Sequence, residues 1–182
     1  MLLDDGWPAC AEWLDPSKPE ASGCANPAPR HDNGDVPVDE RKFPPSGPGA
    51  NDGIKVVADY LHAKGLKMGI YTAPHGRTCG GYWGMLGHEA TDAKMYANWG
   101  IVSGQQHPLA RRPPSLTVVR RWRQDFLKLD MGCREDASIH DGTVKASLER
   151  VRDGLNKTGR PVLCTRRRSA LSSLWMRLQP SR

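Results

Sequence analysis

Short apolar runs that end in charged residues recur along this chain. Residues 125–130 read Asp-Phe-Leu-Lys-Leu-Asp, and in a strand this alternation puts Lys128 and Asp130 on one face and the leucines on the other. A lysine and an aspartate at the end of a buried strand are costly unless they are paired or used. The same layout occurs at residues 1–7, where two carboxylates follow the apolar run, and in a weaker form at residues 66–71.

Helical patterns separate these runs. Residues 52–64 and 88–99 each carry apolar side chains at helical spacing and are followed by a glycine that ends the helix. Residues 141–156 form a third such helix, and residues 161–163 read as the next strand. Alternating strands and helices indicate a parallel sheet. Polar residues at the carboxyl ends of its strands lie where active sites are found in a TIM barrel.

Several motifs around these elements fall in a familiar order. The chain resembles the α-galactosidases (melibiases) of the retaining glycoside hydrolase group that also contains α-N-acetylgalactosaminidase, over residues 1–101 and 125–162. The resemblance implies an α/β fold that is a partial (β/α)8 TIM barrel, comprising the second to fifth strands with their helices. The motifs that carry it are Asp4-Asp5-Gly6-Trp7, Lys42-Phe43-Pro44, Ala58 to Tyr71, Thr78-Cys79, Asp92-Ala93, Trp99-Gly100 and Phe126 to Asp130.

The resemblance also implies roles for individual residues. Asp130 matches the catalytic nucleophile of the family. The aspartate pair matches residues that accept hydrogen bonds from galactose hydroxyls, and the aromatic residues are expected to offer apolar faces to the sugar ring. The implied substrate is a terminal α-galactoside of an oligosaccharide or glycoconjugate, and no cofactor is expected. The sugar-binding positions implied are Asp4, Asp5, Trp7, Tyr71 and Lys128.

The residue types suit the chemistry of a retaining glycosidase. Such an enzyme needs two carboxyl groups about 5 Å apart, one as nucleophile and one as acid/base. Lys128, two residues from Asp130 on the same strand face, favours the charged carboxylate by proximity. Taken alone, the aspartate pair also fits a turn or a helix cap, Tyr71 fits a core residue, and Lys128 with Asp130 fits a buried ion pair. The joint pattern favours the sugar site.

Positive charge is concentrated in two segments. The chain has 26 Lys and Arg against 20 Asp and Glu, a net charge of +6, which suggests a nucleic-acid partner. Residues 102–124 and 164–182 each hold five arginines and no acid, and without those ten arginines 16 basic residues face 20 acidic ones. The basic character is therefore local, and we expect no nucleic-acid partner.

The same two segments interrupt the resemblance. We expect residues 1–163 to form a partial catalytic barrel interrupted by a foreign-looking basic insertion at 102–124, and residues 164–182 to form a basic tail that is disordered or out of frame. We interpret the insertion as translated non-coding sequence, such as a retained intron; the alternative is a genuine insertion that binds acidic partners.

Acidic residues are absent from the last part of the sequence. No Asp or Glu follows Asp153, so we expect the acid/base of the family to be missing. The function expected is that of an α-galactosidase-type hydrolase in an incomplete form, and the alternative is a non-catalytic fragment or a residual carbohydrate-binding protein.

The five cysteines bear on the compartment: pairing in disulfides indicates an oxidising one, and the alternative, which the odd count allows, is reduced thiols in a cytosolic protein. The resemblance pairs Cys79 with Cys133 in a disulfide beside the nucleophile, although Cys133 lies further from the nucleophile than the cysteine of the family usually does. Cys10 and Cys24 can close an excursion rich in Pro, Gly and Asn. Cys164 is left over.

Asn156 opens an Asn-Lys-Thr glycosylation sequon at a helix end. With the disulfides, it indicates that the full-length parent is secreted, lysosomal or vacuolar. Because Met1 lies within an expected barrel strand, we expect the first strand and any signal peptide to be absent. No apolar run is long enough to predict a membrane span, and no residues have the spacing of metal ligands.

Overall fold

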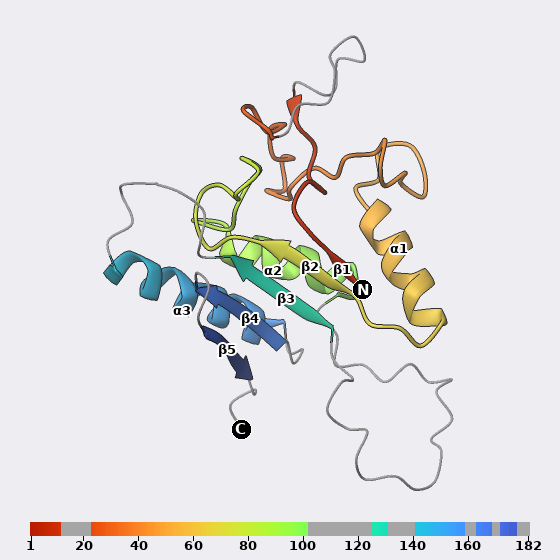
Figure 1. Cartoon of the computed structure of the whole chain (residues 1–182). Coiled ribbons are helices and arrows are strands. Elements are labelled where there is room, and N and C mark those ends of the chain that lie inside the picture. The colour runs from red at the N-terminus through yellow and green to blue at the C-terminus, as the bar shows by residue number, and fades with distance from the viewer. Residues whose placement is uncertain (12–22, 102–124, 131–140, 159–162, 169–171, 178–182) are drawn as a thin grey trace, which may run out of the picture.

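The computed structural model describes residues 1–11, 23–101, 125–130, 141–158, 163–168 and 172–177 and has an α/β arrangement (Figure 1). Strands and helices alternate along most of the chain, as the hydrophobic pattern predicted. The strands are β1 (Leu2–Leu3), β2 (Gly69–Thr72), β3 (Phe126–Asp130), β4 (Leu163–Arg168) and β5 (Ser172–Arg177), and the helices are α1 (Gly53–Ala63), α2 (Glu89–Asn98) and α3 (Asp141–Lys157).

The five strands form one sheet in the order β1-β2-β3-β4-β5. The first four strands are parallel, and β5 returns antiparallel to β4. One helix lies in each connection between parallel neighbours, as a parallel crossover requires. In Figure 1, α1 lies beside the β1 end of the sheet and α3 beside the β4 and β5 end. The prediction of a parallel α/β sheet is therefore confirmed, with one antiparallel strand added.

The structure differs from our prediction near the carboxyl end. We expected residues 164–182 to form a basic tail that is disordered or out of frame, whereas residues 164–168 and 172–177 lie in β4 and β5. The physical reason is that β4 pairs with both β3 and β5, and these main-chain hydrogen bonds do not depend on the arginine side chains. The expected insertion at 102–124 lies outside the described residues.

A single main core joins the sheet to all three helices. On α1, Ile54, Ala58 and Leu61 are buried at the helical spacing that the sequence predicted. On β3, Leu127 and Leu129 are buried and the alternate residues are half-buried. This alternation confirms that β3 turns its leucines to the core and its charged residues to the other face.

Asp125 fixes the start of β3 against its neighbours. Its buried carboxylate accepts the N–H of Met68 at 2.9 Å and lies 3.0 Å from Nε2 of His62 at the end of α1. A buried carboxylate needs such partners to offset the loss of water. Asp125 therefore ties α1 and the entry to β2 to the strand that carries the charged residues.

A glycine allows β2 and β3 to lie in register. Gly69 pairs with Phe126, and Tyr71 pairs with Lys128 two residues further on. A Cβ atom on Gly69 would lie 2.2 Å from Cζ of Phe126, so any larger residue would displace the ring. This register brings the side chains of Tyr71 and Lys128 to the same face of the sheet.

Candidate functional site

Polar side chains gather where β1, β2 and β3 end. Leu3 pairs with Ile70, so Asp4, the residue after β1, is level with Tyr71 on β2. Tyr71 pairs in turn with Lys128 on β3. Three residues that are far apart in the chain therefore lie side by side at the carboxyl edge of the sheet.

The Lys128 ammonium links these strands. Its Nζ donates to both carboxylate oxygens of Asp4 at 3.0 Å and lies 4.7 Å from the centroid of the Tyr71 ring. The Lys128 side chain is 16% exposed and that of Asp4 is 60% exposed. A ligand that reaches Asp4 would therefore meet an accessible carboxylate whose orientation is fixed by a sheltered cation.

Asp5 is held by the 78–82 turn, which the antiparallel bridge between Arg77 and Trp83 closes. Thr78 Oγ1 donates to Oδ1 of Asp5 at 2.9 Å, and the Gly80 N–H donates to Oδ2 at 2.7 Å. The Gly6 N–H also donates to Oδ1, at 3.0 Å. A carboxylate has about four lone-pair positions, so these donors leave Asp5 with capacity for a ligand hydroxyl.

The pKa of Tyr71 responds to burial and to nearby carboxylates. Burial raises the pKa of Tyr71, and the negative charges of Asp130, Asp5 and Asp4 raise it further. A hydrogen bond from the Cys79 backbone acts in the opposite direction. Asp130 ends β3 two residues after Lys128, on the same face of the strand, and therefore lies at the edge where Lys128 binds Asp4.

Neither aromatic residue turns a free ring face to a ligand. Trp7 is 2% exposed, donates from Nε1 to the Tyr71 carbonyl at 2.9 Å, and packs edge-on against Tyr96 and Trp99 at centroid distances of 6.2 and 5.6 Å. The prediction that Trp7 contacts a sugar is therefore wrong, because Trp7 is a core residue beneath the site. Tyr71 is also buried, and the Lys128 ammonium lies over its ring, so its role in sugar binding stays a prediction.

Thr78 and Gly80 are site residues whose role the sequence analysis missed. They reach Asp5 from 73 and 75 residues away, and no local pattern encodes such a contact. Gly80 carries one usable signal, because its Cβ would lie 2.9 Å from Oδ2 of Asp5 and only glycine permits that approach. A glycine pair after a Thr-Cys motif is the feature that marks this turn.

The Cys10–Cys24 disulfide is present, with Cα atoms 5.8 Å apart, which confirms the predicted closed excursion. Cys79 is disulfide-bonded as well. Its predicted partner Cys133 lies outside the described residues, so that pairing stays a prediction. Cys164 lies in β4, and its side chain is also outside the described part.

Asn156 is exposed in the last turn of α3. Thr158, the third residue of the sequon, donates from Oγ1 to the Leu155 carbonyl at 2.6 Å. The asparagine is therefore accessible to a modifying enzyme, and its glycosylation stays a prediction.

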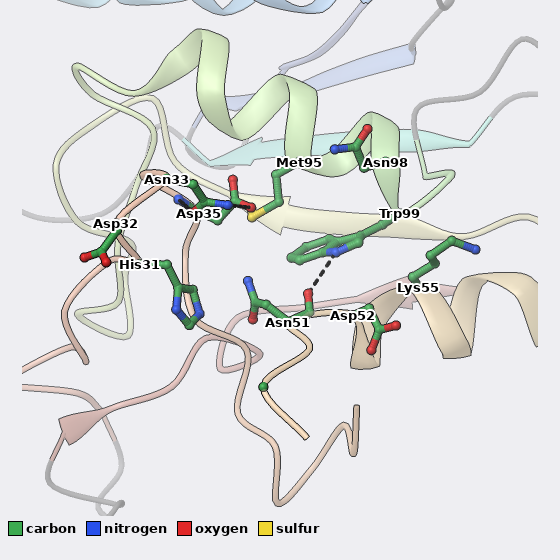
Figure 2. Close-up of a pocket in the computed structure, with 11 residues that line it drawn as sticks. His31, Asp32, Asn33, Asp35, Asn51, Asp52, Lys55, Met95, Asn98 and Trp99 are labelled. Carbon is green, nitrogen blue, oxygen red and sulfur yellow. Dashed lines mark hydrogen bonds between the residues drawn. The ribbon is translucent and has the colours of Figure 1, made fainter. Parts of the chain in front are cut away.

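A hollow of about 550 Å³ lies elsewhere on the molecule (Figure 2). The 31–35 loop, residues 49–52, Lys55 of α1 and the end of α2 line it, and no predicted site residue does. Trp99 donates from Nε1 to the Asn51 carbonyl at its wall, as Figure 2 shows. We assign this hollow no part in the chemistry.

Two further properties concern only the described residues. Among them, no group of three or more His, Cys, Asp or Glu side chains is arranged to hold a metal ion. None of the helices described here combines the length and the apolar character needed to cross a membrane.

Known proteins with related sequences support the resemblance. Residues 20–105 match the family model described as alpha galactosidase A. The chain is 34% identical over 134 residues to alpha-galactosidase A of Cellvibrio japonicus, covering 74% of this chain and 24% of that protein. It is 32% identical over 139 residues to alpha-galactosidase A of Homo sapiens, covering 75% and 24% of the two chains.

Solved structures agree. The α-galactosidase of Saccharomyces cerevisiae matches with a TM-score of 0.57 and 27% identity, covering 91% of this chain and 26% of that one. This chain thus spans about a quarter of the length of the relatives named. The sheet, the carboxylates at its edge and these matches together show that the chain is similar to the α-galactosidases over about a quarter of their length.

Proposed function

We propose that this chain carries the galactose-binding carboxylates and the nucleophile of a retaining α-galactosidase. The observation that supports the proposal is that Asp4 and Asp5 follow β1 and Asp130 ends β3 at the carboxyl edge of a parallel sheet, where Lys128, on the same face of β3 as Asp130, binds Asp4. A solved α-galactosidase of Saccharomyces cerevisiae was determined with raffinose, which supports a sugar as the ligand.

Asp4 and Asp5 would accept hydrogen bonds from two hydroxyl groups of the galactose ring. Both carboxylates are already oriented, by Lys128 and by the 78–82 turn. Oriented acceptors of this kind hold a substrate in the geometry of attack and so lower the entropic part of the barrier. The Lys128 ammonium has three donors, two of which go to Asp4, and the third suits a sugar oxygen.

Asp130 would act as the nucleophile. One of its carboxylate oxygens forms a bond to the anomeric carbon while the bond from that carbon to the aglycone oxygen breaks. The electron pair leaves with the aglycone oxygen, which takes a proton from a general acid. Water then displaces Asp130 at the same carbon, so the product keeps the α configuration.

In the proposed function, the 182 residues as they stand do not complete the hydrolysis, because they lack the general acid. No Asp or Glu follows Asp153, and the carboxylates Asp4 and Asp5 are committed to binding. We therefore expect this chain to hydrolyse aryl α-galactosides no faster than buffer. The same observation favours the second candidate, a carbohydrate-binding protein without catalysis, because the groups that bind a sugar do not require the acid/base.

The proposal also covers the complete fold, the compartment and the binding partner. The four parallel strands β1 to β4 would form the second to fifth strands of an eight-stranded barrel, which the similarity to solved α-galactosidases supports. The Cys10–Cys24 disulfide supports an oxidising compartment, so the full-length parent would be secreted, lysosomal or vacuolar. The partner would be an α-galactoside and not a nucleic acid.

Calorimetric titration with galactose and with glucose, its C4 epimer, tests the binding part. We expect saturable binding that favours galactose. Asp5→Asn should weaken it about tenfold or more, because a hydrogen bond to a charged group contributes about 1.5–3 kcal/mol. The matched control is Asp59→Asn, since Asp59 is 58% exposed on α1. Equal affinities for the wild type and Asp5→Asn would contradict the proposal.

A further inference from the structure

The Cys10–Cys24 disulfide lies against the turn that holds Asp5. Cys10 is 1% exposed and Cys24 is 3% exposed. Tyr82, the last residue of the 78–82 turn, is 4% exposed and forms with the two cysteines a small buried cluster separate from the main core. The disulfide therefore packs against the same turn to which Asp5 binds.

Gly80 connects the disulfide to the carboxylate. Its N–H donates to Oδ2 of Asp5 at 2.7 Å, and its carbonyl accepts the N–H of Cys24 at 2.6 Å. The neighbouring Gly81 has a φ of +85°, and a Cβ there would lie 2.1 Å from the Cys24 carbonyl oxygen. The turn and the Cys24 backbone are thus in direct contact, so a shift of one moves the other.

These contacts close a ring. The chain runs from Asp5 to Cys10, the disulfide leads to Cys24, and the two hydrogen bonds of Gly80 lead back to Asp5. Ala9 and Ala28 strengthen it, because the Ala28 N–H donates to the Ala9 carbonyl at 3.0 Å. A closed ring of this kind restricts the position of the donor that Asp5 depends on.

We propose that the Cys10–Cys24 disulfide is a positioning element for the sugar site, which holds Asp5 in its binding orientation through the peptide groups of Gly80. The statement about affinity rests on the proposed function, because it assumes that Asp5 binds a sugar. The statement that the disulfide fixes the position of Gly80 does not rest on that function, and amide exchange at Gly80 tests it without any ligand. Small displacements of a positioning group have large effects on binding and reaction geometry.

The first test removes the disulfide by Cys10→Ser with Cys24→Ser in the whole chain. Amide hydrogen exchange then reports local opening at each residue. We expect the Gly80 amide to exchange about tenfold faster, while the amides of Ile70 and Leu127 in β2 and β3 keep their protection. Galactose affinity should fall about tenfold in parallel.

A second variant keeps the disulfide and disturbs only the contact. A Cβ on Gly23 would lie 3.3 Å from the Gly80 carbonyl oxygen, whereas a Cβ on Gly47 would meet nothing within 4 Å. Gly23→Ala should therefore speed exchange at Gly80 and weaken galactose binding, and Gly47→Ala should do neither. If the Ile70 amide also exchanges faster in the double serine variant, that variant has unfolded. The result for Gly23→Ala then decides whether the contact with Cys24 positions Gly80.

Unchanged exchange at Gly80 in both variants would overturn the proposal. Faster exchange at Gly80 with unchanged galactose affinity would overturn it too. A wild-type chain that binds no galactose would contradict the proposed function instead. The exchange rates at Gly80 would then still decide whether the disulfide positions the groups around Asp5.

Discussion

Two ion pairs of similar geometry differ in role because they differ in burial. Lys128 and Asp4 meet at the rim of the site, where Asp4 is 60% exposed. Arg30 binds Asp92 with two nitrogens, at 2.6 and 3.0 Å, and Asp92 is 1% exposed. Burial raises the pKa of Asp92, and the Arg30 guanidinium opposes the rise. The first pair therefore serves the surface of the site, and the second holds the loops beneath it.

Single substitutions should separate these roles. Arg30→Met should lower the free energy of unfolding by about 3–5 kcal/mol, because it leaves a buried carboxylate without its cation. Lys128→Met should cost less than about 1 kcal/mol, since exposed pairs contribute little, yet it should weaken galactose binding. Urea denaturation measures the first quantity and calorimetric titration the second. Equal losses of stability for the two variants would show that burial does not distinguish the pairs.

For single residues, the sequence predicts which side chains lie at the end of a strand but not how deeply each one is buried. Asp4, Asp5 and Trp7 belong to one motif, and only the carboxylates reach the site. Trp7 is buried by Tyr96 and Trp99, which lie about 90 residues further along the chain, and no local pattern contains that information. The identification of the nucleophile position depended on the family motif and not on periodicity.

Elements with a local signal were predicted well. The helical stripe of α1 and the alternation in β3 are visible in the sequence, and the structure follows both. The sequence analysis read a strand at residues 161–163 but treated residues 164–182 as a basic tail, so it missed most of β4 and all of β5. The structure defines β4 by its backbone pairing with β3, which lies far earlier in the chain, and β5 by its pairing with β4, so the signal for β4 is not local.

The register of β2 and β3 can be tested at Gly69. Gly69→Ala would bring a Cβ within 2.2 Å of the Phe126 ring, and overpacking of this kind typically costs about 1–3 kcal/mol. Gly76→Ala is the matched control, because nothing lies within 4 Å of its Cβ position. Thermal unfolding should show a lower melting temperature for the first variant only. Equal melting temperatures would mean that the ring moves aside freely.

Glu89 joins α2 to α3, because its buried carboxylate accepts the Arg150 Nε–H at 2.9 Å. Burial is the largest single influence and raises the pKa of Glu89, but the hydrogen bond and charge of Arg150 together with backbone hydrogen bonds from Glu89 and Gly87 outweigh it, and the net pKa is lowered. A carboxyl whose pKa is lower in the folded state stabilises the fold above its ordinary pKa, and that contribution is lost as the pH falls through the folded value.

The free energy of unfolding should therefore fall below about pH 4.3 and do so more steeply in the wild type than in Glu89→Gln. Denaturation curves at a series of acidic pH values give the comparison. The other carboxyl groups titrate in both proteins, so the difference between the two curves isolates Glu89. Parallel curves would exclude a contribution from this pair.

At the scale of the whole molecule, the proposed sugar-binding groups and the proposed nucleophile lie on a sheet that matches about a quarter of an α-galactosidase. Binding depends on groups within this quarter, whereas complete hydrolysis also depends on a general acid. The two activities should therefore separate in this chain. A substrate whose leaving group needs no proton tests the nucleophile without the acid.

The most direct measurement is the intact mass of the chain after incubation with α-D-galactosyl fluoride. Attack by Asp130 breaks the carbon–fluorine bond, fluoride leaves with the electron pair, and a galactosyl ester remains on the carboxylate. We predict a mass increase of one galactosyl group that maps to Asp130, is absent in Asp130→Asn and persists in Asp59→Asn. No adduct on the wild type, or an adduct that persists in Asp130→Asn, would contradict the assignment of Asp130 as the nucleophile.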